Sequence, residues 1–194
     1  MFLATVVVLA GLGALLPLAA VLSAHAARLA ATLASGSAWL VRGASMLGVA
    51  ASLALLLVQV AVVVLVSVFA VSVVWLQESA AYLFAAMFLL GAGGVFLSDG
   101  HVRVDVLSSR WSERVRAGVD LGGIALFLLP VCALILVVSV PWAARSWVTL
   151  ERSGEPSGLH LVFVLKSFVP AFAVLLALSG FVRAEAAARR LRGA

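Results

Sequence analysis

Long stretches without any charged residue constrain this 194-residue chain more than any other feature of its sequence. The longest of them runs from Gly43 to Gln77. Shorter ones cover Met1 to Ala24, Ser79 to Ser98, Leu121 to Ala144 and Ser167 to Val182. A helix needs about 20 apolar residues to cross a bilayer core of roughly 30 Å. Because 65% of the residues are hydrophobic, a soluble domain could not bury them, and the chain is expected to lie in a membrane.

The runs predict an all-α integral membrane protein, because backbone groups in lipid must be satisfied within the spanning segment. The run lengths exclude a β-barrel, whose strands alternate over about ten residues. Five hydrophobic helices are expected, at residues 2–22, 47–76, 79–98, 118–141 and 161–182. Four of them form the core, and the first is an extra N-terminal helix.

Amphipathic pieces complete the predicted organisation. Residues 26–45 carry Arg28 and Arg42 between spaced apolar residues, which is typical of an interfacial helix, and residues 106–117 repeat the pattern before the fourth span. The expected divisions are a hydrophobic helix at 1–25, the interfacial segment at 26–45, a four-helix membrane domain at 46–183 and a basic tail at 184–194.

The arginines orient the spans. Ten of them lie in residues 25–45, residues 99–117 and the C-terminal tail, which alternating spans place on one side. The positive-inside rule makes that side cytoplasmic, so the C-terminus is expected inside and the N-terminus on the periplasmic side. If residues 2–22 lie in the interface instead, four crossings remain. A cleaved signal peptide ending near Ala24 is an alternative, although no basic residue precedes its apolar run.

The composition argues against chemistry carried out by this chain alone. Cys132 is the only cysteine, so it can form no internal disulfide or cysteine metal cluster. The basic residues behind the net charge of +5 lie mainly in loops and the tail. This position indicates that they set the membrane topology and contact anionic lipid, and it argues against nucleic-acid binding. No Walker A, HExxH or GxSxG motif is present, and no span carries the acidic residues of an ion pathway. We expect no enzyme activity, no cofactor and no metal.

Polar and aromatic residues gather where the second and third spans meet on the outer side. The predicted turn contains Trp75, Gln77 and Glu78, and Tyr82 follows one helical turn later. Aromatic side chains at a membrane edge anchor at headgroup level, whereas a carboxylate there is either hydrated or paired. Both a structural role and contact with a partner protein remain open for these residues.

The second outer connection is predicted as a loop over residues 142–160, with Arg145, Trp147 and Glu155 in it. Lys166 follows just inside the last span, where its ammonium can extend outward to the interface. Its expected partner is Glu78, Glu151 or Glu155. These charges can satisfy one another or meet another protein.

The inner loop contains a further polar group, made of Asp99, His101, Arg103 and Asp105. A metal site would need more converging ligands than one histidine and two carboxylates. Contact with the membrane surface or with another subunit is therefore expected for this loop.

In their order and spacing, these motifs resemble the small permease subunit of tripartite ATP-independent periplasmic (TRAP) transporters, the DctQ-like family. The resemblance covers residues 45–182. It rests on Trp75-Leu76-Gln77-Glu78 with Tyr82, Asp99-Gly100-His101-Val102-Arg103-Val104-Asp105 after the Gly91 region, Ser139-Val140-Pro141-Trp142 with Arg145-Ser146-Trp147, and Glu155-Pro156-Ser157-Gly158-Leu159 before Lys166-Ser167.

The resemblance implies a four-span subunit in the bacterial inner membrane. Its partners would be a large DctM-like permease subunit, which carries organic acids such as dicarboxylates with sodium, and a periplasmic substrate-binding protein. The small subunit would scaffold and anchor the large one and help to dock the binding protein. Residues 1–25 depart from the four-span pattern.

Three other classes of protein would differ from a transporter subunit in properties that can be tested. A self-contained small transporter or channel would move solute when purified alone. An intramembrane enzyme needs paired catalytic groups at depth, and the sequence of the spans shows none. A membrane scaffold unrelated to transport would share the topology without the ordered motifs.

Overall fold

The computed structural model describes residues 19, 24–98 and 111–193, and every element within them is a helix. The elements are α2 (Ala24–Phe69), α3 (Val74–Leu97), α5 (Glu113–Gly123), the π-helical turn η1 (Ile124–Leu128), α6 (Leu129–Thr149) and α7 (Val162–Gly193). α5, η1 and α6 follow one another directly and form one long helix. Together with α2, α3 and α7, this gives four apolar helices in the described residues that are long enough to cross a membrane. The predicted all-α membrane fold with four core spans is confirmed. The helix predicted at 2–22 falls, apart from residue 19, outside the described residues.

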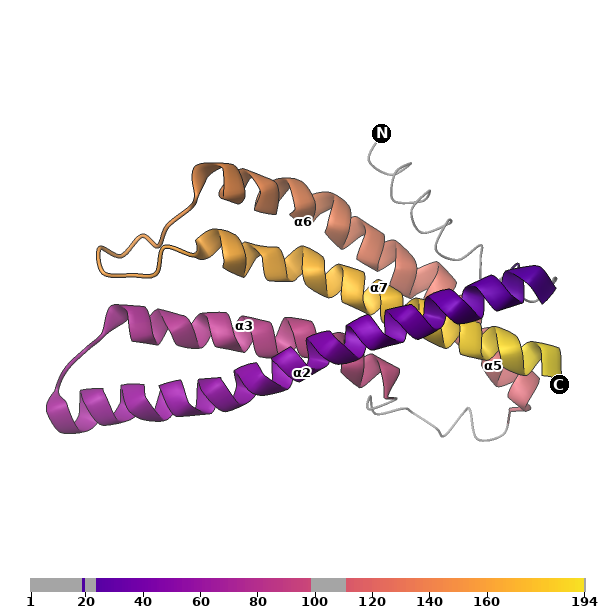
Figure 1. The fold of residues 1–194 in the computed structure, drawn as a ribbon, viewed down its shortest axis with the longest axis horizontal. Coiled ribbons are helices and arrows are strands. Elements are labelled where there is room, and N and C mark those ends of the chain that lie inside the picture. Colours follow the sequence, from indigo (N-terminus) through magenta and orange to yellow (C-terminus); the bar gives the residue numbers. More distant parts are fainter. Residues whose placement is uncertain (1–18, 20–23, 99–110, 194) are drawn as a thin grey trace.

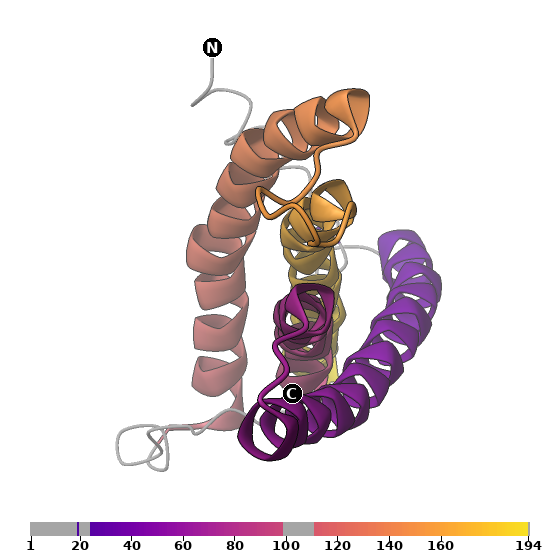
Figure 2. The ribbon, with the colours of Figure 1, turned by 90° about the vertical axis from the view of Figure 1, so that its left-hand side faces the viewer.

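The spans form two antiparallel hairpins, α2 with α3 and α6 with α7 (Figure 1). The α2–α3 turn and the α6–α7 loop lie at the same end of the molecule, here called the loop end. Viewed from the loop end, α3 and α7 lie between α6 on one side and α2 on the other (Figure 2). Since α7 contacts α2, α3, α5, η1 and α6, it connects the two hairpins.

Glycines allow α2 and α3 to cross closely. A Cβ on Gly48 would lie 3.0 Å from the backbone nitrogen of Gly91 and 3.2 Å from the carbonyl oxygen of Met87. Likewise, a Cβ on Gly94 would lie 2.7 Å from the Cβ of Ser45. Lipid offers no hydrophobic driving force between helices, so close backbone approach of this kind is a main source of their association.

Polar contacts join α7 to α3. The hydroxyl oxygen of Ser179 lies 2.9 Å from the carbonyl oxygen of Gly93 and 2.7 Å from that of Leu175, so its proton can bridge the two. Arg183 Nη1 donates to the carbonyl oxygen of Phe96 at 2.9 Å. That carbonyl belongs to the last turn of α3, where helix carbonyls have no partner within the helix. α7 therefore caps α3.

The turn after α2 differs from the sequence prediction of a span to residue 76 and a turn at Glu78. α2 ends at Phe69, and the chain reverses through residues 70–73. Ala70 takes a left-handed φ of 54°, a conformation that costs a non-glycine residue roughly 1–2 kcal/mol. No glycine, proline or charge marks this turn, so the sequence could not place it. Trp75 and Gln77 consequently lie in the first two turns of α3 together with Glu78.

The prediction of a loop over residues 142–160 was also wrong at its start. α6 continues past Pro141 to Thr149, and Leu150 ends it with a left-handed φ of 44°. Ala143 and Ser146 are buried in this last part of α6, which explains why the helix persists beyond the proline. The loop covers residues 150–161.

The interfacial segment predicted at 26–45 forms the first part of α2 and continues into the span without a break. At 1.5 Å per residue, the 46-residue helix is about 69 Å long, more than twice the thickness of a bilayer core. Arg28 and Arg42 are exposed and precede the uncharged run. Placement of this part along the membrane surface stays a prediction.

We expect Gly48→Leu to lower the thermal midpoint of the purified protein. Forcing a side chain into the α2–α3 crossing should cost about 1–3 kcal/mol, since the nearest atoms are backbone. Tryptophan fluorescence during heating measures this. Gly43→Leu on the same helix is the control, because a Cβ there would meet nothing within 4 Å. Equal midpoints for the two variants would contradict the packing described here.

Candidate functional site

Glu78 joins α3 to the loop between α6 and α7. Its carboxylate accepts hydrogen bonds from the hydroxyl of Ser153 and, at 2.6 Å, from the backbone N–H of Leu159. The N–H of Ser153 donates to the carbonyl of Leu159 at 3.1 Å, which closes the loop across its base. One carboxylate thus holds both arms of the loop against α3.

Gly158 lets the loop lie directly on this carboxylate. The residue is buried, and its N–H donates to the carbonyl of Glu155 at 3.0 Å. A Cβ at this position would lie 2.7 Å from each carboxylate oxygen of Glu78 and 2.5 Å from the Ser153 hydroxyl. Any larger residue would therefore push the loop away from α3.

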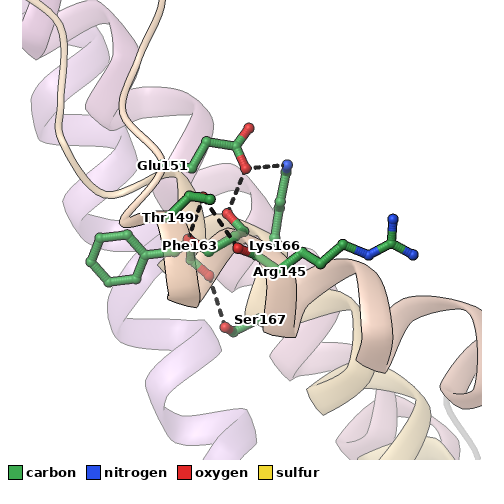
Figure 3. A network of polar contacts seen from close by, with 7 residues as sticks. Arg145, Thr149, Glu151, Phe163, Lys166 and Ser167 are labelled. Carbon is green, nitrogen blue, oxygen red and sulfur yellow. Dashed lines mark hydrogen bonds and ion pairs between the residues drawn. The ribbon is translucent and has the colours of Figure 1, made fainter.

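A second group of contacts holds the loop to α6 and α7 (Figure 3). Lys166 Nζ lies 2.5 Å from Glu151 Oε2, and the Ser146 hydroxyl donates to the same oxygen at 2.7 Å. The ammonium also lies 4.6 Å from the ring centroid of Trp142, within cation–π range. The hydrogen bond from Lys166, followed by that from Ser146, lowers the pKa of Glu151 below its ordinary value.

Trp147 connects α6 and α7 beside this ion pair. Its Nε1 donates to the hydroxyl of Ser167 at 2.8 Å. Its ring packs against Phe163 with centroids 4.6 Å apart at an interplanar angle of 60°. Half of the side chain stays exposed, so Trp147 can also anchor at the membrane edge.

Arg145 and Glu155 were expected to join these charges, but they stand apart. Both are exposed, and Arg145 points away from Glu151 in Figure 3. Neither side chain makes an ion pair or a side-chain hydrogen bond with the part of the chain that the structure describes. Among the described residues they are thus an unpaired cation and an unpaired anion on the surface of the loop end.

The aromatic and amide residues at the start of α3 have separate environments. Trp75 is exposed, and Gln77 donates from Nε2 to the hydroxyl of Ser72 at 3.2 Å. The hydroxyl of Tyr82 is buried and finds no hydrogen-bond partner among the described residues. Roles for these three residues in contact with a partner stay predictions.

The inner-loop residues Asp99, His101, Arg103 and Asp105 lie outside the described residues, so contact through this loop stays a prediction. Within the described ranges, no three His, Cys, Asp or Glu side chains come together to hold a metal ion.

Several residues of the site carry little signal in the sequence. Of the three partners expected for Lys166, the structure shows Glu151. Ser153 and Gly158 belong to a stretch that reads only as a turn, because their roles depend on Glu78, which is 75 or more residues away. The sequence predicted no role for Asp120, which directly precedes the uncharged run of the fourth span.

Four long apolar helices, with ion pairs and charged side chains gathered toward their ends, define a multi-pass helical membrane protein. The family model of the DctQ component of tripartite ATP-independent periplasmic transporters matches residues 55–192, more than half of the chain. The chain therefore belongs to the DctQ family, and the resemblance is confirmed. The family is a component of a transporter of three parts and not a family of enzymes. Neither the curated proteins nor the solved structures give a match.

Glu78→Gln should loosen the loop without unfolding the spans. Hydrogen bonds to a charged group contribute about 1.5–3 kcal/mol, so hydrogen exchange at the Leu159 amide should accelerate about tenfold or more. Hydrogen–deuterium exchange of the peptide containing this amide measures the change. Glu155→Gln is the control and should leave exchange unchanged. Unaltered exchange in Glu78→Gln would show that the carboxylate does not hold the loop.

Acid should weaken the ion pair between Glu151 and Lys166. Since the folded state lowers the pKa of Glu151, its stabilisation is present above the ordinary pKa of 4.5 and is lost as the pH falls below it. We expect Glu151→Gln to lower the thermal midpoint near pH 7. On acidification, the thermal midpoint of this variant should fall less than that of the unchanged protein. Glu155→Gln should keep the profile of the unchanged protein. Identical pH profiles for Glu151→Gln and the unchanged protein would refute this.

Proposed function

We propose that this chain is the small membrane subunit of a sodium-coupled, binding-protein-dependent transporter for organic acids in the bacterial inner membrane. The observation that carries the proposal is the DctQ match over residues 55–192. The uncharged middle of each described span supports it. A path for sodium and a carboxylate substrate would need polar groups at depth, so we assign that path to the large DctM-like subunit.

The small subunit then scaffolds and anchors the large one. Exposed apolar side chains follow α2 through its uncharged run, among them Leu53, Leu57 and Val60. Such a surface suits lipid or the apolar helices of a partner. The close α2–α3 crossing and the contacts of α7 favour a body that keeps its shape while a partner moves.

The loop end is the proposed docking surface for the periplasmic substrate-binding protein. Glu78 and Lys166 hold the 150–161 loop in place, whereas Arg145 and Glu155 stay exposed beside it. A preorganised loop with unpaired charges loses little conformational freedom when another protein binds. The arginines at the opposite helix ends support a cytoplasmic C-terminus and a periplasmic loop end, by the positive-inside rule.

The test is reconstitution of the chain with its genomic neighbours. The tagged chain should retain a large multi-span partner on purification. Proteoliposomes holding both should take up a labelled dicarboxylate only with a sodium gradient and the binding protein. A chain that leaves the membrane alone and moves solute by itself would overturn the proposal in favour of a self-contained transporter.

Docking is tested separately from assembly. Arg145→Gln with Glu155→Gln should lower uptake at limiting binding-protein concentration while the yield of the complex stays constant, because both side chains are exposed. Ser72→Ala, also exposed at the loop end, is the matched control. Uptake equal to that of the unchanged complex would remove these two charges from the docking surface.

A further inference from the structure

An apolar groove lies toward the basic end of the molecule, opposite the loop end. Its cavity of about 480 Å³ lies among α3, α5, η1, α6 and α7. Ile124, Phe127, Leu128, Val131 and Leu176 supply most of its apolar wall. Phe127 and Val131 are also largely exposed, so the groove opens on the surface that faces lipid or a partner.

The helix is wider here than elsewhere in the span. η1 replaces an α-helical turn with a π-helical one, an irregularity that often accompanies functional sites. Opposite it, Gly180 brings α7 close, since a Cβ there would lie 2.4 Å from Leu128 Cδ2. The groove is thus shaped by backbone features and not by a loosely packed side chain.

Charged side chains stand at one end of this groove. Asp120 and Arg183 line it, and with Arg190 they also line an adjoining cavity of about 210 Å³. Asp120 is half-buried, and its side chain makes no ion pair or hydrogen bond within residues 24–98 and 111–193. Arg183 donates to the carbonyl of Phe96, which fixes its guanidinium beside the groove.

A carboxylate beside two guanidinium groups suits a ligand that carries both a positive and a negative charge. A partly buried carboxylate without a partner is costly, and a cation would relieve that cost. Guanidinium groups bind phosphate through charge-assisted hydrogen bonds. The groove itself suits a long apolar chain. A phosphate, a cation and an acyl chain in one molecule describe a phospholipid with an ammonium headgroup.

We propose that this groove binds a phospholipid with a primary ammonium headgroup, of the phosphatidylethanolamine class. One acyl chain lies along Ile124, Leu128 and Leu176. The phosphate meets Arg190 beside Arg183, and the ammonium donates hydrogen bonds to Asp120. A primary ammonium fits better than a trimethylated one, because only the former has N–H donors for the carboxylate.

The test is native mass spectrometry of the purified complex with its large subunit, equilibrated with equal amounts of phosphatidylethanolamine, phosphatidylcholine and phosphatidylglycerol. The unchanged complex should retain the first in preference to the others. Asp120→Asn should reduce that preference about tenfold, as expected for one charge-assisted hydrogen bond. Arg190→Gln should lower retention of all three lipids. Glu113→Gln and Arg192→Gln, each on the same helix as one of the tested residues, are the controls.

Three results would overturn the proposal. Equal retention of the three lipids by the unchanged complex would mean ordinary boundary lipid. Unchanged preference in Asp120→Asn would separate the carboxylate from the headgroup. Efficient cross-linking of Phe127→Cys to the large subunit would show that a protein helix fills the groove. If Asp120→Asn fails to assemble, the ranking of lipids by the unchanged complex and the cross-linking of Phe127→Cys still decide.

Discussion

The packing of α7 against its neighbours is the interaction on which the remaining structure depends. In lipid, apolar side chains gain nothing by leaving their solvent, so helices associate through close approach and a few polar bonds. α7 provides both. Its Ser179 meets the backbone of Gly93, and its Gly180 lies against Leu128. The Ser179 contact, the bond from Arg183 to Phe96 and the packing of α7 on α2 hold the α2–α3 hairpin against α7, whereas Gly180 packs α7 on the helix it pairs with.

The two ends of the molecule use their charges differently. At the loop end, Glu78 and Lys166 are satisfied within the chain and order a loop. At the basic end, Glu185 is buried against Arg189 at 2.5 Å, whereas Arg190 and Arg192 are exposed. An ordered polar surface suits contact with a protein, and exposed arginines beside apolar helices suit phospholipid headgroups. Under the proposals made above, the same four-helix body offers a protein partner one end and lipid headgroups the other.

The sequence predicted the class of fold and the spans well, because apolar run length is a direct consequence of bilayer thickness. It failed at the turn after Phe69, where Ala70 adopts a left-handed conformation that its residue type does not favour. It also ended α6 too early, because Trp142 and the charge of Arg145 resemble a membrane edge while buried Ser146 keeps the helix intact. The pairing of Glu78 with Ser153 was beyond sequence reasoning, since it depends on how distant helices pack.

The folded unit begins earlier than the part of the chain that marks the family. The DctQ match starts at residue 55, within α2. Yet Ser45 and Gly48 precede that point and pack directly on Gly94 and Gly91, which lie inside the match. Helix α2 therefore cannot be cut at the family boundary without opening the crossing that places α3. The helix runs without a break from Ala24 to Phe69, so its first part is directly joined to that crossing. A helix that is continuous with the packed body in this way fits the anchoring role that we propose for the subunit.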